Sequence, residues 1–156
     1  MTFLKHDSST FAADAARGFV LAHCDAVQSV FGGVVRTTRS AEDEVALVIG
    51  GGSGHYPAFA GLVGPGLAHG AVLGNIFASP SARQVESVAR TVEQGRGVLL
   101  SYGNYAGDKL QFDEASAALE ATGIEVRTVR VTDDISSAPE SEIDKRRGIA
   151  GDLVVF

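Results

Sequence analysis

The chain has 156 residues and a mass of 16.2 kDa, which is enough for one ordinary hydrophobic core, so we expect a single domain. Hydrophobic residues make up 45% of the chain and charged residues 21%, a balance typical of a folded globular protein rather than a disordered one. The net charge of −6 argues against a nucleic-acid-binding protein, because such proteins need a basic face.

Cysteine content and apolar tracts bear on the cellular compartment. Cys24 stands alone, which argues against a disulfide framework and suits a reducing interior. The first residues lack the apolar segment of a signal peptide. The apolar tract over residues 58–78 is broken by Pro65 and several glycines, so we do not expect it to span a membrane. Together these features predict a cytoplasmic protein with no membrane partner.

The first half of the chain predicts a helix followed by two strands. Apolar residues recur at helical spacing over residues 11–30, with Thr10 as a plausible N-cap and Gly32-Gly33 as a stop. The continuous apolar run 45–49 predicts a buried strand. A short helix is expected over 58–63 and a second strand over 71–77.

The second half continues this alternation. Ser79-Pro80 predicts a helix start, with the hydroxyl as cap, and this helix runs to Gly95. A strand is expected over 97–101, a helix from Asp108 to Gly123, a strand over 124–131 and turns over 132–142. The pattern predicts an α/β fold, with a mostly parallel sheet and helices on both faces. The apolar end, 148–156, indicates either a last strand or a cut chain; we favour a cut, with residues 1–156 belonging to a longer protein.

The most informative stretch follows the first buried strand and reads Gly-Gly-Gly-Ser-Gly-His over residues 50–55. Ligands of open α/β sheets bind at this end of the strands, and glycines allow a positive φ and a close approach of backbone N–H groups. A phosphate loop would need Lys-Ser/Thr where His55-Tyr56 stands, and a dinucleotide loop would need glycine at 55. The simpler alternative is a tight connection with a surface histidine.

A second polar loop, residues 101–108, follows another predicted strand and should meet the first at the same edge of the sheet. It would bring the Asp108 carboxylate to the His55 imidazole, with Asn104 nearby as an amide donor and acceptor. A carboxylate beside a histidine can orient the ring or take a proton from a substrate hydroxyl. The structural alternative for Asp108 is a helix N-cap, and the two roles are compatible.

Other polar residues have simpler interpretations. We expect His69 to be solvated in a loop, and Ser79 to cap a helix. Asp133-Asp134 has no further oxygen ligands at suitable spacing, so it predicts a solvated bend rather than a cation site. The basic cluster 145–147 predicts a solvated turn.

An ordered set of motifs resembles the dihydroxyacetone kinase family. The set comprises the 50–57 loop, Phe-Ala-Ser-Pro-Ser over 77–81, Asn-Tyr-Ala-Gly-Asp over 104–108, Asp133-Asp134, and Arg-Arg-Gly-Ile-Ala-Gly over 146–151. The match is to the N-terminal half of the family's substrate-binding K portion. The resemblance implies a fold similar to the mannose-family phosphotransferase A domain, a homodimer, and a short-chain ketose as substrate. The donor, either ATP with Mg²⁺ on a helical domain or a phosphotransferase relay, would lie outside this chain.

The resemblance also implies roles for particular residues. Gly52, Ser53, Gly54 and His55 match the substrate loop, His55 the histidine that binds substrate and assists proton transfer, and Asp108 the proposed general base. This agrees with what phosphoryl transfer requires, namely positioning and one proton acceptor. None of the four histidines matches the family's covalent histidine, which belongs to the second half of the K portion.

Two departures from the family's dihydroxyacetone enzymes concern the substrate. Gly103 stands where they carry lysine, and Tyr56 where they carry glutamate, which favours a different or larger ketose such as erythrulose. Two other functions stay open at this stage. One is a non-catalytic ketose-binding regulator, and the other is a sugar-phosphate isomerase or related phosphate-binding enzyme.

Overall fold

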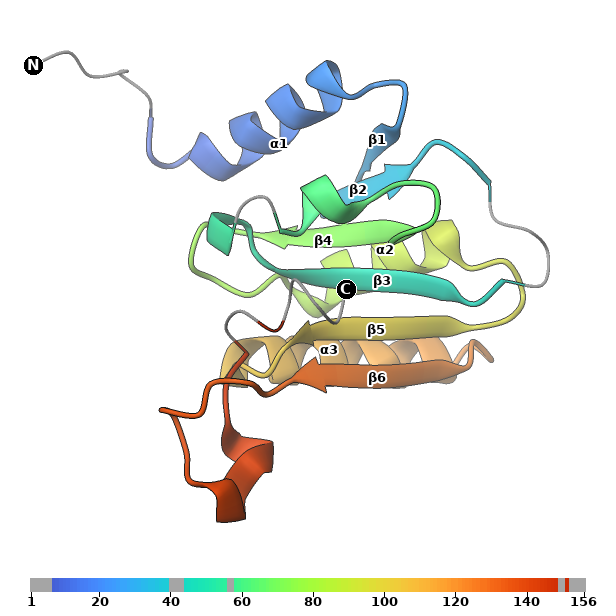
Figure 1. Ribbon diagram of the computed structural model, residues 1–156. Helices are drawn as coiled ribbons and strands as arrows, with labels where there is room; N and C mark the ends of the chain where they lie inside the picture. The colour runs from blue at the N-terminus through green and yellow to red at the C-terminus, as the bar shows by residue number, and fades with distance from the viewer. Residues whose placement is uncertain (1–6, 40–43, 56–57, 149–150, 152–156) are drawn as a thin grey trace, which may run out of the picture.

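A six-stranded sheet organises the molecule in the computed structural model, which describes residues 7–39, 44–55, 58–148 and 151. The strand order is β1-β2-β4-β3-β5-β6 (Figure 1). The strands are β1 (Val27–Val30), β2 (Gly33–Arg36), β3 (Ala46–Gly52), β4 (Gly70–Gly74), β5 (Val98–Gly103) and β6 (Val126–Val131). The helices are α1 (Phe11–Ala22), α2 (Ala82–Val92) and α3 (Ala106–Glu120), with short 3₁₀ turns η1 (Ser53–His55), η2 (Ala60–Leu62) and η3 (Glu140–Lys145).

The strand order reverses at β3. β3 pairs in parallel with β4 on one side and β5 on the other, and β5 pairs in parallel with β6. Among the described strands, only the β1–β2 hairpin and its junction with β4 are antiparallel. The predicted mostly parallel α/β fold is confirmed. In such sheets the crevice at the carboxyl ends of the strands where the order reverses is the favoured place for a ligand, and here it is formed by β3, β4 and β5.

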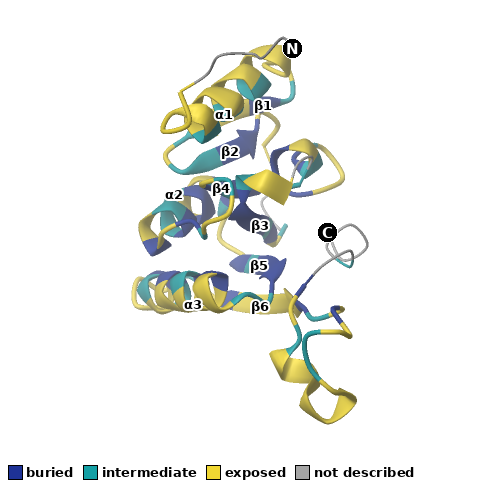
Figure 2. Cartoon of the chain, turned by 90° about the vertical axis from the view of Figure 1, so that its left-hand side faces the viewer, coloured by how far each residue is buried: buried dark blue, intermediate teal, exposed yellow. Residues whose placement is uncertain are grey.

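Neighbouring residues of the strands point to opposite faces, and each face has its own core. Val35 and Val48 pack with α2 and α3, whereas Val34 and Ile49 pack with Phe19 of α1 and with η2. Figure 2 shows the buried strands β3 and β5 beside the exposed outer surface of α3. The predicted helices on both faces are therefore present, although α1 contributes no fully buried residue.

The predicted helix over residues 11–30 is wrong in its second half. α1 ends at Ala22, and β1 and β2 form a hairpin in which Val30 pairs with Gly33. Gly32 has φ of 84° in the two-residue turn, so the glycines mark a hairpin rather than a helix stop. The β-branched residues on both sides of the turn favour strands, and pairing with β4 decides the outcome.

Two helix starts also differ from the prediction. α2 begins at Ala82 with Ser81 as N-cap, and α3 begins at Ala106 with Tyr105 as N-cap, so neither Ser79 nor Asp108 caps a helix.

Of residues 148–156 only Gly148 and Gly151 are described, so the predicted last strand or cut end lies outside the described residues. The likeness to the mannose-family phosphotransferase domain stays a prediction. No described helix is both long and apolar enough to cross a bilayer.

Candidate functional site

Three loops meet at the carboxyl edge of β3, β4 and β5. The Ser53 and Gly54 N–H groups donate to the carbonyls of Asn75 and Ile76, at 3.1 and 2.7 Å, which joins the loop after β3 to the loop after β4. The rings of His55 and Tyr105 lie 6.0 Å apart between centroids, which brings the loop after β5 to the same place. The predicted meeting of the His55 and Asp108 loops is thus present, with the loop after β4 as a third member.

The glycines of residues 50–54 allow close packing rather than unusual backbone angles. Gly52 still belongs to β3, and none of the five residues has a positive φ. A Cβ on Gly51 would lie 2.7 Å from the ring of Phe59, and one on Gly52 would lie 2.9 Å from the carbonyl oxygen of Ile76. The expected positive φ is therefore wrong, and the expected close approach is made by the protein's own chain.

The N–H groups of Ser53 and Gly54 are also not open to a ligand, because they donate to the Asn75 and Ile76 carbonyls. An anion would have to break these bonds to reach a backbone donor in this part of the loop. This finding disfavours the phosphate-binding hypothesis. It leaves the Ser53 hydroxyl, on a half-buried residue, as the loop's polar side chain before the histidine.

His55 is exposed at the end of η1 and lies between two aromatic rings. Its ring centroid is 6.0 Å from that of Phe59 and 6.0 Å from that of Tyr105. The Tyr105 hydroxyl in turn donates to the Gly148 carbonyl, which fixes that ring. The imidazole is thus held in place by its neighbours yet open to an incoming molecule.

Asp108 is a buried carboxylate in the first turn of α3, with only 6% of its surface exposed. Its Oδ1 has no hydrogen-bond partner among the described residues. Burial raises the pKa of Asp108 above its ordinary value, while a hydrogen bond from Ser79 and the charge of His55 act in the opposite direction. A buried acceptor without a partner is costly, so a site at this point that supplies a donor is chemically reasonable.

Asn104 was predicted to offer its amide to this site, but the structure uses that amide elsewhere. Its amide nitrogen donates to the carbonyls of Asp144 and Arg146, at 2.9 and 2.7 Å. The predicted solvated bend at Asp133-Asp134 is wrong for Asp134, which is buried and pairs with Arg147 at 3.0 Å. Asp133 is exposed and accepts the Gly151 N–H at 2.7 Å.

Residues 144–148 and Gly151 are therefore anchored beside the site by side chains of two loops. The nearby Ser136 hydrogen bond, followed by Arg147, holds the pKa of the Asp134 carboxyl below its ordinary value. The basic cluster is thus only partly a solvated turn, since Arg147 pairs with a buried carboxylate.

His69 is buried rather than solvated, with 3% of its surface exposed. Its Nδ1 accepts the backbone N–H of Leu47 at 3.1 Å, and its Nε2 lies 3.3 Å from Glu44, which also pairs with Arg36 at 2.9 Å. This cluster belongs to the opposite, amino end of β3. It is a structural cluster, and His69 takes no part in the candidate site.

Ser79 does not cap α2 as predicted, because the N-cap is Ser81. Its hydroxyl lies against the first turn of α3, where a Cβ on Gly107 would be 2.6 Å from Oγ. The capping-box pattern of Ser81 and Gln84 could have shown that the true cap lies two residues later. That pattern would have released Ser79 for another role.

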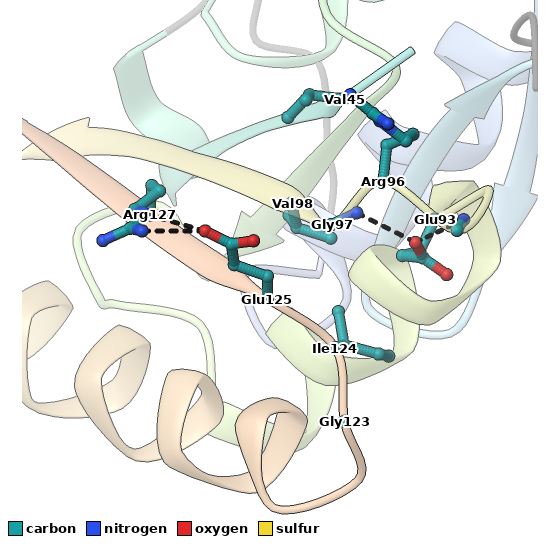
Figure 3. Close-up of a pocket in the computed structure, with 10 residues that line it drawn as sticks. Val45, Glu93, Arg96, Gly97, Val98, Gly123, Ile124, Glu125 and Arg127 are labelled. Carbon is teal, nitrogen blue, oxygen red and sulfur yellow. Dashed lines mark hydrogen bonds and ion pairs between the residues drawn. The ribbon is translucent and has the colours of Figure 1, made fainter. Parts of the chain in front are cut away.

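Two cavities among the described residues are lined by neither His55 nor Asp108. One of about 610 Å³ lies at the amino ends of the strands, between the α2–β5 and α3–β6 turns (Figure 3). There the Glu93 carboxylate accepts the N–H groups of Gly95 and Gly97, and Glu125 pairs with Arg127 at 2.8 Å, so the polar groups satisfy one another. A mostly apolar cavity of about 310 Å³ separates α1 from the back of the Ser53-Gly54 loop.

An α/β domain with an exposed imidazole and a buried, partly unpaired carboxylate at its strand reversal is suited to binding a small hydroxyl compound. Comparison with known proteins defines the family. The Dak1 domain profile matches residues 17–156, and the chain belongs to the Dak1 domain family.

Relatives and a solved structure agree with this assignment. The chain is 64% identical over 156 residues to an L-erythrulose kinase of Pectobacterium atrosepticum, covering all of this chain and 26% of that protein. It is 47% identical over 123 residues to the dihydroxyacetone-binding subunit DhaK of PTS-dependent dihydroxyacetone kinase 2 from Listeria innocua, covering 79% of this chain and 37% of that protein.

The solved structure is that of the dihydroxyacetone kinase from C. freundii in complex with AMP-PNP and Mg²⁺. It superposes with a TM-score of 0.87 at 34% identity, over 99% of this chain and 29% of that one. The chain thus spans about a quarter of the length of the kinases it matches.

Proposed function

We propose that this chain is the N-terminal α/β part of the ketose-binding portion of a kinase that phosphorylates the terminal hydroxyl of a short-chain ketose. The observation that carries the proposal is the buried Asp108 carboxylate, whose Oδ1 has no described partner, at the strand reversal beside the exposed His55. Erythrulose is the preferred candidate substrate, because identity to the erythrulose kinase is higher than to the dihydroxyacetone-binding subunit.

The chemistry asks two things of these residues. Asp108 takes the proton of the terminal hydroxyl while that oxygen forms its bond to the donor's terminal phosphorus and the bond to the bridging oxygen breaks. His55 hydrogen-bonds the ketose, and a proton on its ring would favour the ionised form of Asp108. Gly52, Ser53 and Gly54 form the wall that carries His55, and the Ser53 hydroxyl is available to a substrate oxygen.

The donor is proposed to be ATP with Mg²⁺, bound by a domain or subunit outside this chain. The described residues contain no group of three His, Cys, Asp or Glu side chains able to hold a metal ion. The Ser53 and Gly54 N–H groups are engaged by carbonyls, so this loop does not fit a triphosphate. We therefore assign no catalytic step to a metal or nucleotide held here. The full-length protein is proposed to be a cytoplasmic homodimer.

Turnover and binding by the full-length protein test the proposal. L-erythrulose, D-erythrulose and dihydroxyacetone are each supplied with ATP and Mg²⁺, ADP release is followed, and the product is identified by ³¹P NMR. We expect ketose-dependent phosphorylation with an erythrulose preferred in kcat/KM. Absence of turnover with all three ketoses, under both ATP and phosphotransferase donors, would refute the kinase assignment. Calorimetric binding without turnover would instead indicate a ketose-binding regulator.

A further inference from the structure

The chain returns to the candidate site after the excursion that follows β6. The Asp134 N–H donates to the Arg147 carbonyl at 2.9 Å, and the Asp134 carboxylate pairs with the Arg147 side chain at 3.0 Å. The Ser137 hydroxyl accepts the Arg147 N–H at 3.0 Å. Three contacts therefore fix the backbone of Arg147 just before Gly148, the residue that reaches the loop after β5.

The loop after β5 holds this segment with two consecutive side chains. The Asn104 amide donates to the carbonyls of Asp144 and Arg146, at 2.9 and 2.7 Å. The Tyr105 hydroxyl donates to the carbonyl of the buried Gly148, 43 residues further along the chain. Tyr105 is also the N-cap residue of α3. Its ring is thus fixed at the hydroxyl end by segment 144–148 and at the backbone end by the start of a helix.

The Tyr105 ring lies against the imidazole of His55. The two ring centroids are 6.0 Å apart and the planes are inclined by 50°. On its other side His55 meets Phe59, also at 6.0 Å, with an angle of 54°. Tilted arrangements at this separation are favourable for aromatic rings. Because exposed side chains change rotamer within nanoseconds, two fixed rings beside the imidazole restrict the orientations that it can adopt.

Resting on the proposed role of His55, we propose that Tyr105 is a positioning residue that fixes the orientation of the His55 imidazole, with its own ring fixed by the Gly148 carbonyl. Segment 144–148 thereby becomes a component of the site, although none of its side chains has to touch the ketose. An imidazole that spends only part of its time in the binding orientation lowers the apparent affinity by that fraction. Tyr105 therefore contributes mainly to KM.

The first test is Tyr105→Phe in the full-length protein, which keeps the ring and removes the hydroxyl that donates to Gly148. From the usual contribution of one hydrogen bond, we expect KM for erythrulose to rise roughly 3- to 10-fold and kcat to change by less than about twofold. Tyr102→Phe is the matched control. It removes the hydroxyl that accepts from Arg130 Nε at 3.0 Å, on a ring that stacks on Phe112 of α3, so KM should stay at the wild-type value. An unchanged KM in Tyr105→Phe, or an equal rise in Tyr102→Phe, would overturn the inference.

A double-mutant cycle separates positioning of His55 from a general effect on the fold. In the His55→Gln background the Tyr105 ring has no imidazole to hold, so Tyr105→Phe should leave kcat/KM unchanged there. A loss of the same size in both backgrounds would show that Tyr105 acts independently of His55, and the inference would then be wrong.

Histidine NMR separates this inference from the proposed function, because it needs no ketose. The Cε1–H signal of His55, assigned by its loss in His55→Gln, is recorded in full-length protein labelled at histidine Cε1. Aromatic rings shift the resonances of nearby protons, so a movement of the Tyr105 ring displaces this signal. We expect a displacement in Tyr105→Phe and none in Tyr102→Phe, even if no ketose is phosphorylated. A His55 signal that keeps its wild-type position in Tyr105→Phe would contradict the positioning role.

Discussion

Two histidine–carboxylate pairs among the described residues lie at opposite ends of β3, and they are built in opposite ways. In the pair at the carboxyl end, the carboxylate of Asp108 is buried and the imidazole of His55 is exposed. In the pair at the amino end, His69 is buried and Glu44 is partly exposed. The same two chemical groups therefore occupy reversed environments within one sheet.

Each pair contains a buried atom without a described hydrogen-bond partner, His69 Nε2 and Asp108 Oδ1, and the pairs differ in what fixes the buried group. His69 is held through Nδ1 by the Leu47 N–H, and Glu44 is shared with Arg36, so this pair ties a strand start to the hairpin. Asp108 has Oδ1 without a described partner, and His55 is within reach of a ligand. A buried acceptor beside an exposed imidazole suits proton transfer, whereas a buried imidazole bound to backbone suits stability.

The largest expected effect comes from Asp108→Asn. Asparagine keeps the shape of the side chain but cannot accept the hydroxyl proton as a base, so we expect turnover of the full-length kinase to fall by about 10²-fold or more. Ketose binding, measured by calorimetry, should survive. Turnover within about twofold of wild type would show that Asp108 is not the base.

The same variant should also change stability, in the opposite sense. Burial raises the pKa of Asp108 above the ordinary 3.8, so the ionised form at neutral pH disfavours the folded state. We expect Asp108→Asn to increase the free energy of unfolding at pH 7, measured by urea denaturation, and this gain to disappear as pH falls toward 3.8. A loss of stability at pH 7 would mean that the carboxylate is well satisfied.

His55→Gln should give the next largest effect. Glutamine keeps hydrogen-bonding capacity but cannot exchange a proton as an imidazole can, so we expect kcat/KM for erythrulose to fall roughly tenfold or more. Because His55 is exposed, the unfolding midpoint should move little. A variant that loses stability but keeps kcat/KM would place His55 with His69 among the structural residues.

His69→Phe tests the structural pair. It leaves the Leu47 N–H without its acceptor at a partly buried position, so we expect a loss of about 1–3 kcal/mol in the free energy of unfolding. Activity per folded molecule should stay unchanged, because His69 lies at the other end of β3. A specific loss of turnover without destabilisation would contradict this division of roles.

The smallest expected effect is a contribution of His69 to the pH dependence of the free energy of unfolding. Burial, followed by the nearby Arg36, holds the pKa of His69 below its ordinary 6.5, against the opposing influence of Glu44. The unfolded chain then binds the proton more readily, so the contribution of neutral His69 is complete above about pH 6.5 and is lost as pH falls below it. Unfolding free energies between pH 8 and 5 should show a shallower acid decline in His69→Gln than in wild type.

The sequence predicted the candidate site better than the details around it. The parallel sheet and the loops of His55 and Asp108 followed from short apolar runs and the edge rule for α/β sheets. The roles of Asn104, Asp134 and His69 could not be predicted, because each is set by a partner 13 or more residues away in the chain, such as the Arg146 carbonyl or the Leu47 N–H. The hairpin at Gly32 was missed because its valines also fit a helical period.

Sequence alone determined the fold class, the family and the two loops, because period, glycine content and motif order are local properties of the chain. Tertiary structure decided what those residues do. It showed that the glycines of 50–54 admit neighbouring backbone and the ring of Phe59, and that the Ser79 hydroxyl packs against the first turn of α3, where Gly107 has no side chain. Close approach depends on segments that are distant in the sequence, so it cannot be deduced from the local pattern of residues.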